Sequence, residues 1–133
     1  MFNKILFPTL FVSDQDRALE FYERLGFEKR ADNPGPEGRF VMIGLRGGDG
    51  NVVLWPGTGG KGTVGSGLPA NTTAGALFLQ SDDLEKDFAT LKARGVKLLE
   101  AGPERYAYGL RATAVDPDGN LISLRQLTPQ WRS

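Results

Sequence analysis

The sequence predicts an α+β fold built from two tandem βαβββ modules. Short apolar runs typical of strands surround two segments with helical spacing. The turn sequence Asp-Gly-Asn occurs twice, at 49–51 and 118–120, and each copy precedes an apolar run. When the chain is slid against itself by 69 positions (118 minus 49), seven identities align without a gap, which indicates an internal duplication. The pairs are Leu10 with Leu79, Asp14 with Asp83, Gly26 with Gly95, Pro34 with Pro103, Asp49 with Asp118, Gly50 with Gly119 and Asn51 with Asn120.

The first module has the predicted order strand, helix and three strands. The apolar run from Ile5 to Val12 is typical of a buried strand. Ser13 or Asp14 is expected to cap the helix that follows, and Gly26 supplies its left-handed end. The apolar positions of this helix are Ala18, Leu19, Tyr22 and Leu25. Strands are then expected in GFEKRAD, RFVMIGL and NVVLW, with the turn RGGDG before the last of them.

The second module repeats this order. The segment GALFLQ predicts a strand, and Asp82 or Asp83 is expected to cap the next helix. Leu84, Phe88 and Leu91 form the apolar side of that helix, and Gly95 ends it. The segments GVKLLE, GLRATAV and NLISLRQ predict three more strands, with the turn DPDG before the last.

The whole chain, residues 1–133, is expected to form one domain, because each module is too small to bury its sheet face alone. The expected bounds are about 4–56 for the first module, 57–74 for a Gly-rich linker, 75–127 for the second module and 128–133 for a tail. The linker composition is typical of a flexible connection. Its segment GTGGKGT does not match a phosphate loop, since Gly62 follows Lys61 where Ser or Thr is required.

The composition limits the possible functions. Sixteen basic residues balance sixteen acidic ones without a block of like charge, so neither nucleic acid nor a membrane is an expected partner. A small molecule or another protein chain is expected instead. The sequence has no cysteine and no histidine, which removes thiolate chemistry, the usual general base and the commonest metal ligand. The N-terminal run is too short and too interrupted for a signal peptide, so a cytoplasmic location is the expectation.

Two motifs together resemble the glyoxalase/bleomycin-resistance/dioxygenase superfamily, also called vicinal oxygen chelate. VSDQDRALEFYERLGF opens the first module and DPDGNLISLRQ closes the second, and the resemblance covers about Ile5 to Gln126. It implies curved mixed sheets around a central cavity, often completed by a homodimer. It does not fix a reaction, because the superfamily includes isomerases, dioxygenases, transferases and drug-sequestering proteins.

The resemblance also implies four positions where metal enzymes of the superfamily hold an ion with His, Gln or Glu. In this sequence they are Phe7, Leu54, Ala76 and Ser123, which the 69-residue offset links in pairs. None supplies the imidazole, carboxylate or thiolate that a divalent ion needs. The neighbouring residues offer no such ligand either, so the chain is expected to work without a metal or another cofactor.

Alternation along the strands predicts which side chains share the cavity face with those four positions. They are Thr9, Phe11, Val52, Phe78, Gln80, Leu121 and Arg125. The result would be an apolar, aromatic chamber with a few polar groups, which suits a small organic ligand. Alternatively, Phe7, Phe11, Leu54 and Phe78 fill the barrel as core. Arg125 either clamps a carboxylate or stacks on a ring, or it is a solvated strand end.

The segment ERYAYGLR places aromatic and basic side chains at the entry to the penultimate strand. Tyr106, Tyr108 and Arg111 are predicted to form the rim of the site, although surface loops carry such residues in any protein. Arg39 occupies the position equivalent to Tyr108 and is a second candidate. Trp131 either packs against a partner chain or frays with the tail.

The leading functional prediction is a metal-independent protein that binds a small molecule, sequestering a drug or an aromatic metabolite, and that forms a homodimer. The alternative is a lyase, isomerase or dioxygenase of the same superfamily with non-standard catalytic groups. No catalytic residue is predicted, since the expected cavity strands carry no acidic residue. A third possibility is a structural partner whose barrel is plugged.

Overall fold

The computed structural model describes residues 1–35, 39–57 and 76–132. The chain divides into two compact units, Met1–Thr63 and Val64–Ser133. Within the described residues, each unit has its own mixed sheet, of four strands in unit 1 and five in unit 2, and one α-helix. The predicted α+β class and the two βαβββ modules are confirmed. Most of the predicted linker, residues 58–74, lies outside the described residues.

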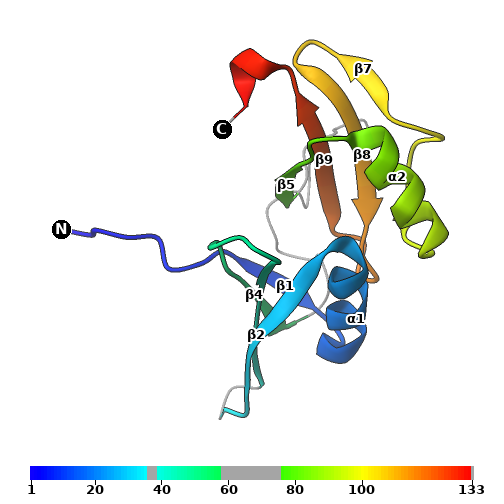
Figure 1. Cartoon of the computed structure of the whole chain (residues 1–133). Helices are drawn as coiled ribbons and strands as arrows, with labels where there is room; N and C mark the ends of the chain where they lie inside the picture. Colours follow the sequence, from blue (N-terminus) through cyan, green and yellow to red (C-terminus); the bar gives the residue numbers. More distant parts are fainter. Residues whose placement is uncertain (36–38, 58–75, 133) are drawn as a thin grey trace. The chain divides into compact units, whose positions relative to one another are not determined.

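Unit 1 consists of β1 (Thr9–Val12), α1 (Gln15–Leu25), β2 (Phe27–Asn33), β3 (Phe40–Leu45) and β4 (Val52–Pro56). Its sheet has the order β1-β4-β3-β2. Figure 1 labels β1, β2 and β4 of this sheet. β1 and β4 are parallel, whereas β4 with β3 and β3 with β2 are antiparallel. The first and last strands of the module, β1 and β4, are therefore neighbours in the sheet, and β2, β3 and β4 follow one another as antiparallel strands.

α1 begins and ends where its sequence predicts. The Asp14 side chain accepts a hydrogen bond from the Arg17 backbone N–H at 3.0 Å, so Asp14 and not Ser13 is the cap. Gly26 ends the helix with a φ of 114°, a conformation that residues with a Cβ rarely adopt. Tyr22 of α1 contacts Phe27 of β2 edge to face, with ring centroids 5.5 Å apart.

The core of unit 1 lies between α1 and the sheet face to which Phe27 belongs. Ladder pairs point to the same face of a sheet, and Leu54 pairs with both Leu10 and Val41. These three side chains are at most 3% exposed. The Gln15 side chain donates to the Leu54 carbonyl at 2.9 Å, which ties the start of α1 to β4.

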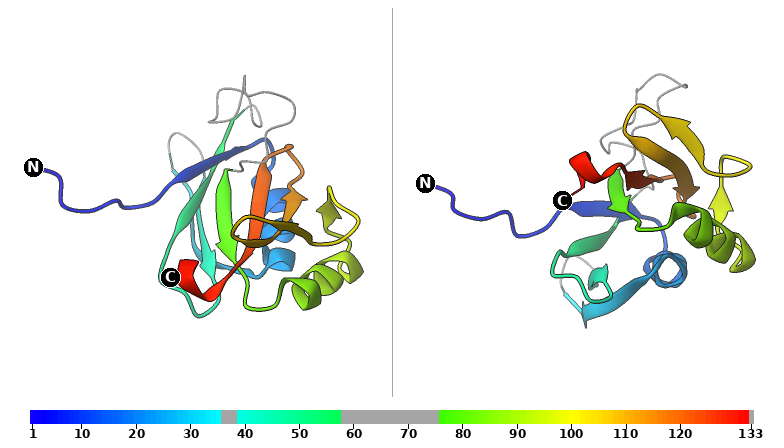
Figure 2. Two further views of the ribbon diagram at one scale, coloured as in Figure 1. Left: turned by 90° about the horizontal axis from the view of Figure 1, so that it is seen from above. Right: turned by 45° about the horizontal axis from the view of Figure 1, so that its top comes forward.

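The first strand is shorter than predicted. Residues 1–8 form no strand, and Ile5 and Leu6 are 87% and 70% exposed. The ladder begins after Pro8, whose carbonyl accepts from the Val53 N–H at 3.0 Å and which has no N–H of its own to continue the pairing. The preceding segment extends away from the sheet of unit 1 (Figures 1 and 2).

Unit 2 consists of β5 (Leu77–Gln80), α2 (Leu84–Ala93), β6 (Lys97–Leu98), β7 (Glu104–Tyr106), β8 (Gly109–Val115), β9 (Leu121–Leu127) and a short 3₁₀-helix, η1 (Pro129–Trp131). Its sheet has the order β5-β9-β8-β6, and β7 also pairs with β8. β5 and β9 are parallel, which matches β1 and β4 of unit 1.

α2 covers one face of this sheet. Asp83 caps the helix by accepting from the Lys86 N–H at 3.1 Å, and the three predicted apolar positions of α2 are buried. The Leu84 N–H donates to the Gln126 side chain at 2.7 Å, so α2 lies on the face to which Gln126 points. Ile122 and Leu124 lie on the same face as Gln126, because every second residue of a strand points to the same side. They are 0% and 5% exposed. Figure 2 shows α2 beside this sheet.

The strand predicted in GVKLLE is reduced to two residues, and a further strand, β7, follows it. β7 pairs with β8 as a hairpin, with Tyr106 opposite Gly109. Gly109 has a φ of 143°, and a Cβ on it would overlap the Gln126 carbonyl oxygen. The hairpin therefore requires glycine at this position, where the backbone of β9 approaches closely.

The two units differ in register by one residue. Thr9 of β1 pairs with Val53, whereas Phe78, its equivalent in β5, pairs with Ser123. The structural equivalent of Ser123 in unit 1 is therefore Val53 and not Leu54. The prediction that Leu54 shares a face with Thr9 and Phe11 is wrong, because a shift of one residue moves a side chain to the opposite face. Val52 lies on the same face as Leu54, so the prediction that it shares the cavity face is wrong for the same reason.

Candidate ligand-binding site

The sheet face of unit 2 opposite α2 carries a cluster of aromatic rings and arginines. Register places Phe78 with Ser123 and Gln80 with Arg125, as alternation predicts. Arg125 in turn pairs with Arg111 of β8, and Arg111 pairs with Glu104 of β7. Tyr106, two residues after Glu104, points to the same side. Four neighbouring strands thus contribute to one face.

Arg125 lies between two aromatic rings. Its guanidinium carbon is 5.1 Å from the centroid of the Phe78 ring and 5.0 Å from that of the Tyr106 ring. Arg111 approaches the same Tyr106 ring, with its guanidinium carbon 5.6 Å from the centroid. These distances are within the range of cation–π attraction. Tyr106 therefore connects the two arginines.

The positive charge on this face is poorly compensated. The Nε atom of Arg125 is buried and has no hydrogen-bond partner among the described residues. Arg111 has Glu104 nearby, but its Nε atom and the carboxylate oxygen are 3.9 Å apart, too far for a hydrogen bond. Arg111 and Arg125 also stand directly opposite each other on neighbouring strands, an arrangement that is unfavourable for like charges.

The aromatic surface continues beyond Tyr106. Tyr108 contacts Tyr106 at a centroid distance of 5.8 Å, and Trp131 of η1 contacts Tyr108 at 5.1 Å, both edge to face. Phe78, Tyr108 and Trp131 are 59%, 48% and 52% exposed, so a ligand can reach them. The sequence predicted Tyr106, Tyr108 and Arg111 as a rim, and the structure brings them together with Arg125 and Phe78.

Sequence reasoning left Trp131 out of the site. The tail that carries it is fixed by Arg132, which donates to the Leu127 carbonyl at 3.1 Å and to Asp82 at 2.9 Å. The Trp131 N–H also bonds the Thr128 carbonyl at 2.9 Å. Pro129 near the start of η1 was the available signal, since proline favours the first turn of a helix.

Sequence reasoning also missed the role of Glu100 at the base of the face. Ser123 and its ladder partner Thr113 are 0% and 5% exposed. The Glu100 carboxylate accepts from the Thr113 N–H at 2.7 Å and from the Thr113 hydroxyl at 2.8 Å. Glu100 thus supplies hydrogen-bond acceptors to β8 between the part of β8 that pairs with β6 and the part that pairs with β7. No local pattern marks this role, because its partner is 13 residues away.

The candidate residues of unit 1 have a different setting. The rings of Phe7 and Phe40 lie 6.0 Å apart, and Thr9 and Phe11 are exposed on the sheet face away from α1. Leu54 is fully buried on the α1 side, so here the alternative role as core is the one observed. The predicted chamber lined by both units remains a prediction.

Arg39, the second rim candidate, is engaged by acidic side chains. It donates to Asp32 through two nitrogens, at 2.6 and 2.7 Å, and pairs with Asp16 at 2.8 Å. The hydrogen bond from Arg39 is the main cause that lowers the pKa of Asp32 to about 2, and the hydrogen bond from Lys29 adds to it. A guanidinium held by two carboxylates is not available to a ligand.

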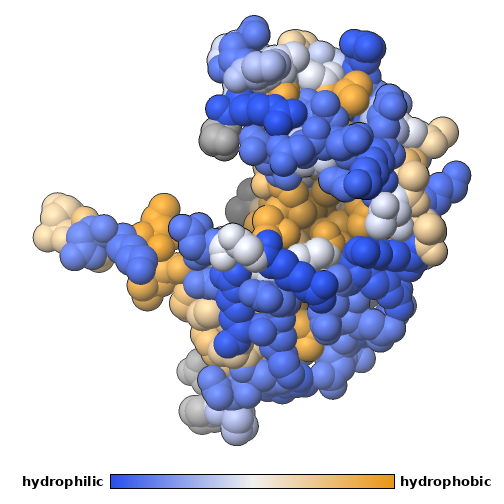
Figure 3. Space-filling view, viewed as in Figure 1, coloured by the Kyte–Doolittle hydropathy of each residue, from blue (hydrophilic) through white to orange (hydrophobic). Residues whose placement is uncertain are grey.

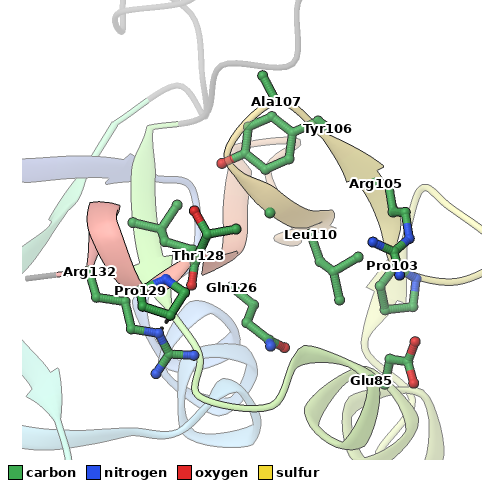
Figure 4. A pocket seen from close by; sticks show the side chains of 12 residues that line it. Glu85, Pro103, Arg105, Tyr106, Ala107, Leu110, Gln126, Thr128, Pro129 and Arg132 are labelled. Atoms are coloured by element: carbon green, nitrogen blue, oxygen red, sulfur yellow. Dashed lines mark hydrogen bonds between the residues drawn. The ribbon is translucent and has the colours of Figure 1, made fainter.

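Unit 2 also has a hollow of about 580 Å³ beside the start of α2 (Figure 4). Arg132 and Gln126 line it, and both are already bound by protein groups. Arg105 reaches it from β7, on the face opposite Arg111. Because the buried Nε of Arg125 on the aromatic face has no acceptor among the described residues, the aromatic face is the stronger candidate. The other lining residues are Glu85, Pro103, Tyr106, Ala107, Gly109, Leu110, Leu127, Thr128 and Pro129.

The family relationship is decided by a match to a sequence model. The model described as the glyoxalase/bleomycin resistance protein/dioxygenase superfamily matches residues 4–124. The chain belongs to this superfamily. The resemblance seen in the sequence motifs is thereby confirmed.

Relatives in the superfamily cover nearly the whole chain. YurT of Bacillus subtilis strain 168 is 33% identical in an alignment 132 residues long, which covers 92% of this chain and 98% of the relative. The crystal structure of TnmS3, an antibiotic-binding protein from Streptomyces sp. CB03234, is 34% identical with a TM-score of 0.74 and covers 96% and 98% of the two chains. A bleomycin-binding protein in complex with bleomycin is 26% identical with a TM-score of 0.63 and covers 95% and 100%.

The metal site of the superfamily's metal enzymes does not fit these residues. Of the corresponding positions, Ser123 offers one hydroxyl, and Phe7, Ala76 and either Leu54 or Val53 offer no ligand atom in their side chains. Throughout residues 1–35, 39–57 and 76–132, no three His, Cys, Asp or Glu side chains lie close enough to hold a metal ion. The side chains at the four corresponding positions are therefore unsuited as ligands of a divalent ion.

Over those same ranges, the structure has no helix long and apolar enough to cross a membrane.

Proposed function

We propose that this protein binds a small organic molecule on the aromatic face of unit 2 and does so without a metal ion. The observation that carries the proposal is the position of Arg125, between Phe78 and Tyr106 and without an acceptor for its buried Nε among the described residues. A few polar groups within an aromatic surface are typical of small-molecule sites. Sequestration of a drug or an aromatic metabolite is the proposed role.

The relatives support this role. TnmS3 is described as an antibiotic-binding protein, and a second similar structure is a complex of a bleomycin-binding protein with bleomycin. Binding without turnover also agrees with the chemistry of the face. The carboxylate of Glu100 is partly buried and both of its oxygens accept hydrogen bonds from Thr113, so it is not placed as a free general base.

Equilibrium dialysis against aromatic antibiotics and aromatic metabolites tests the proposal directly. We expect saturable retention of at least one compound, at one site per chain, with no chemical change in the recovered compound. Retention should persist after dialysis against a chelator, and elemental analysis should find no stoichiometric metal. Loss of binding on chelation, or conversion of the compound to a product, would favour the enzyme alternative.

We further propose that the protein is a homodimer. The N-terminal segment exposes Met1, Phe2, Ile5 and Leu6, each at 70% or more, and Figure 3 shows apolar side chains along it. Exposed apolar surface of this kind is usually covered by a partner. Light scattering on the full chain should give twice the monomer mass of 14.5 kDa, and removal of residues 1–6 should reduce the measured mass.

Cell fractionation would test the expected cytoplasmic location.

A further inference from the structure

We propose that the ligand is a planar aromatic molecule bearing an acidic oxygen group, such as a carboxylate, and that Arg125 and Arg111 hold that group. This inference rests on the proposed function, because it names the class of ligand that the same face would bind. It also assigns the two arginines a role in specificity, as the groups that distinguish an anionic ligand from a neutral one of the same shape.

The first support is the pairing of like charges. Arg111 and Arg125 are direct ladder partners, and paired residues on neighbouring strands hold their Cβ atoms about 5 Å apart. Both guanidinium groups also approach the same Tyr106 ring, so the two positive charges lie near each other and repel unless an anion lies between them. A bound carboxylate would turn this repulsion into two attractions.

The second support is the hydrogen-bonding state of Arg125. Two aromatic rings compensate part of its charge, but rings do not replace the oxygen acceptors that guanidinium N–H groups need. Its buried Nε has no acceptor among the described residues. A ligand oxyanion is the acceptor that best suits a guanidinium, because the planar fork of donors can bind both oxygens of a carboxylate.

The third support is the state of the neighbouring acids. Both oxygens of Glu100 accept hydrogen bonds from Thr113. Glu104 is 3.9 Å from Arg111 and its side chain is 56% exposed, so it compensates Arg111 only weakly. Gln80, the ladder partner of Arg125 on β5, is neutral. Among the described residues, the positive charge of the arginine pair is therefore compensated only weakly.

The fourth support is the ring surface around the arginines. Phe78 and Tyr108 are 59% and 48% exposed on the same side of the sheet as Arg125. A flat aromatic body can stack on these rings while its acidic group reaches the guanidinium groups. An aliphatic acid would satisfy only the charge, and a neutral aromatic compound would satisfy only the rings.

Two dyes with the same skeleton test the inference. 8-Anilinonaphthalene-1-sulfonate carries an acidic group, and N-phenyl-1-naphthylamine is its neutral counterpart. Fluorescence titration of the full-length folded protein should show the sulfonate binding at least about tenfold more tightly, as expected for charged hydrogen bonds. The affinity for the sulfonate should fall with increasing salt, and that for the neutral dye should not.

Arg125→Met should weaken binding of the sulfonate about tenfold or more and change binding of the neutral dye less than about threefold. Arg125→Lys keeps the charge but not the fork, so it should recover only part of the loss. Arg111→Met should have the same direction and a smaller effect. Urea unfolding of each variant would show that the native fold is retained.

Arg105→Met is the matched control. Arg105 is an arginine of the same sheet, but it pairs with Leu110 and so lies on the opposite face. It should bind both dyes as the unaltered protein does. If Arg105→Met weakens the sulfonate and Arg125→Met does not, the anion is held in the hollow beside α2 and the inference is wrong.

The remaining outcomes separate the inference from the proposed function. Equal affinity for the two dyes, or an equal loss of both in Arg125→Met, would show an aromatic site without selection for anions. In that case the proposed function stands and the inference fails. If neither dye binds in a saturable way, both fail.

Discussion

The two Asp-Gly-Asn turns have the same sequence, yet different residues hold them in place. In unit 2, Asp116 accepts from the N–H groups of Asp118 and Asn120 at 2.9 and 2.8 Å, and from the Asn120 side chain at 2.8 Å. The equivalent position in unit 1 is 47 (116 minus 69), which is Gly47 with a φ of 78°. The carboxylate that organises one turn is therefore missing from the other.

Unit 1 uses a residue from another strand instead. Arg30 of β2 donates to the carbonyls of Leu45, Gly48 and Gly50 and to the Asn51 side chain. The two modules therefore share the turn sequence, but not the hydrogen bonds that hold the turn in place. One turn is stabilised locally, and the other depends on a contact between strands.

The largest effect should come from removing the local support. Asp116→Ala would leave three donors without their acceptor at a site that is 4% exposed. We expect a loss of about 3 kcal/mol in the free energy of unfolding, measured by urea titration. Asp49→Ala, an exposed residue of the other turn, is the control and should stay within about 0.5 kcal/mol of the unaltered protein. Equal losses would mean that the turns are held alike.

The support from β2 should have a smaller effect. Arg30→Met removes donors to three carbonyls, but the Arg30 side chain is 20% exposed and water can replace part of the contact. We expect a loss of about 1 to 2 kcal/mol by the same measurement. Gly44→Ala should act through the same contact, because an added Cβ would overlap the Arg30 guanidinium. The double variant should then lose less than the sum of the two single losses.

Features that depend on neighbours in the sequence could be predicted. Both helix caps and both left-handed glycines after the helices follow from local patterns, and Asp14, Gly26, Asp83 and Gly95 are where these patterns place them. The predicted order of strand, helix and three strands also holds in unit 1.

Features set by contacts between strands could not be predicted from the sequence. The face of Leu54 depends on a register that differs by one residue between the units, and the repeat alone does not reveal it. β7 lacks an apolar alternation and is held by the backbone of β8. In the candidate site, the ring and arginine residues were predicted by type, but the position of Arg125 between two rings arises from three strands together.

The same contrast applies to the arginines of the two units. Arg39 is held by Asp32 and Asp16, whereas Arg125 lies between rings and opposite another arginine. Arg39→Met should therefore lower the urea midpoint, and Arg125→Met in the unbound protein should leave it unchanged or raise it at low salt. A clear loss of stability in Arg125→Met would show that Arg125 is a structural residue whose charge the protein itself compensates.

The smallest effect concerns acid. Arg39 holds the folded-state pKa of Asp32 at about 2, below its ordinary value of 3.8. A lowered pKa means that the ionised form stabilises the fold fully above pH 3.8, and that this contribution is lost as the pH falls from 3.8 toward 2.

The difference in unfolding free energy between the unaltered protein and Asp32→Asn should therefore shrink over that range and stay constant above it. Because water still reaches the Asp32 side chain, which is 23% exposed, and screens the ion pair, the change should be small, and NMR titration of the Asp32 carboxyl is the sharper measurement. In Arg39→Met, the Asp32 pKa should return toward 3.8, since the strongest hydrogen bond to the carboxylate is gone. An unchanged pKa in that variant would mean that Lys29, 3.2 Å from Asp32, lowers it instead.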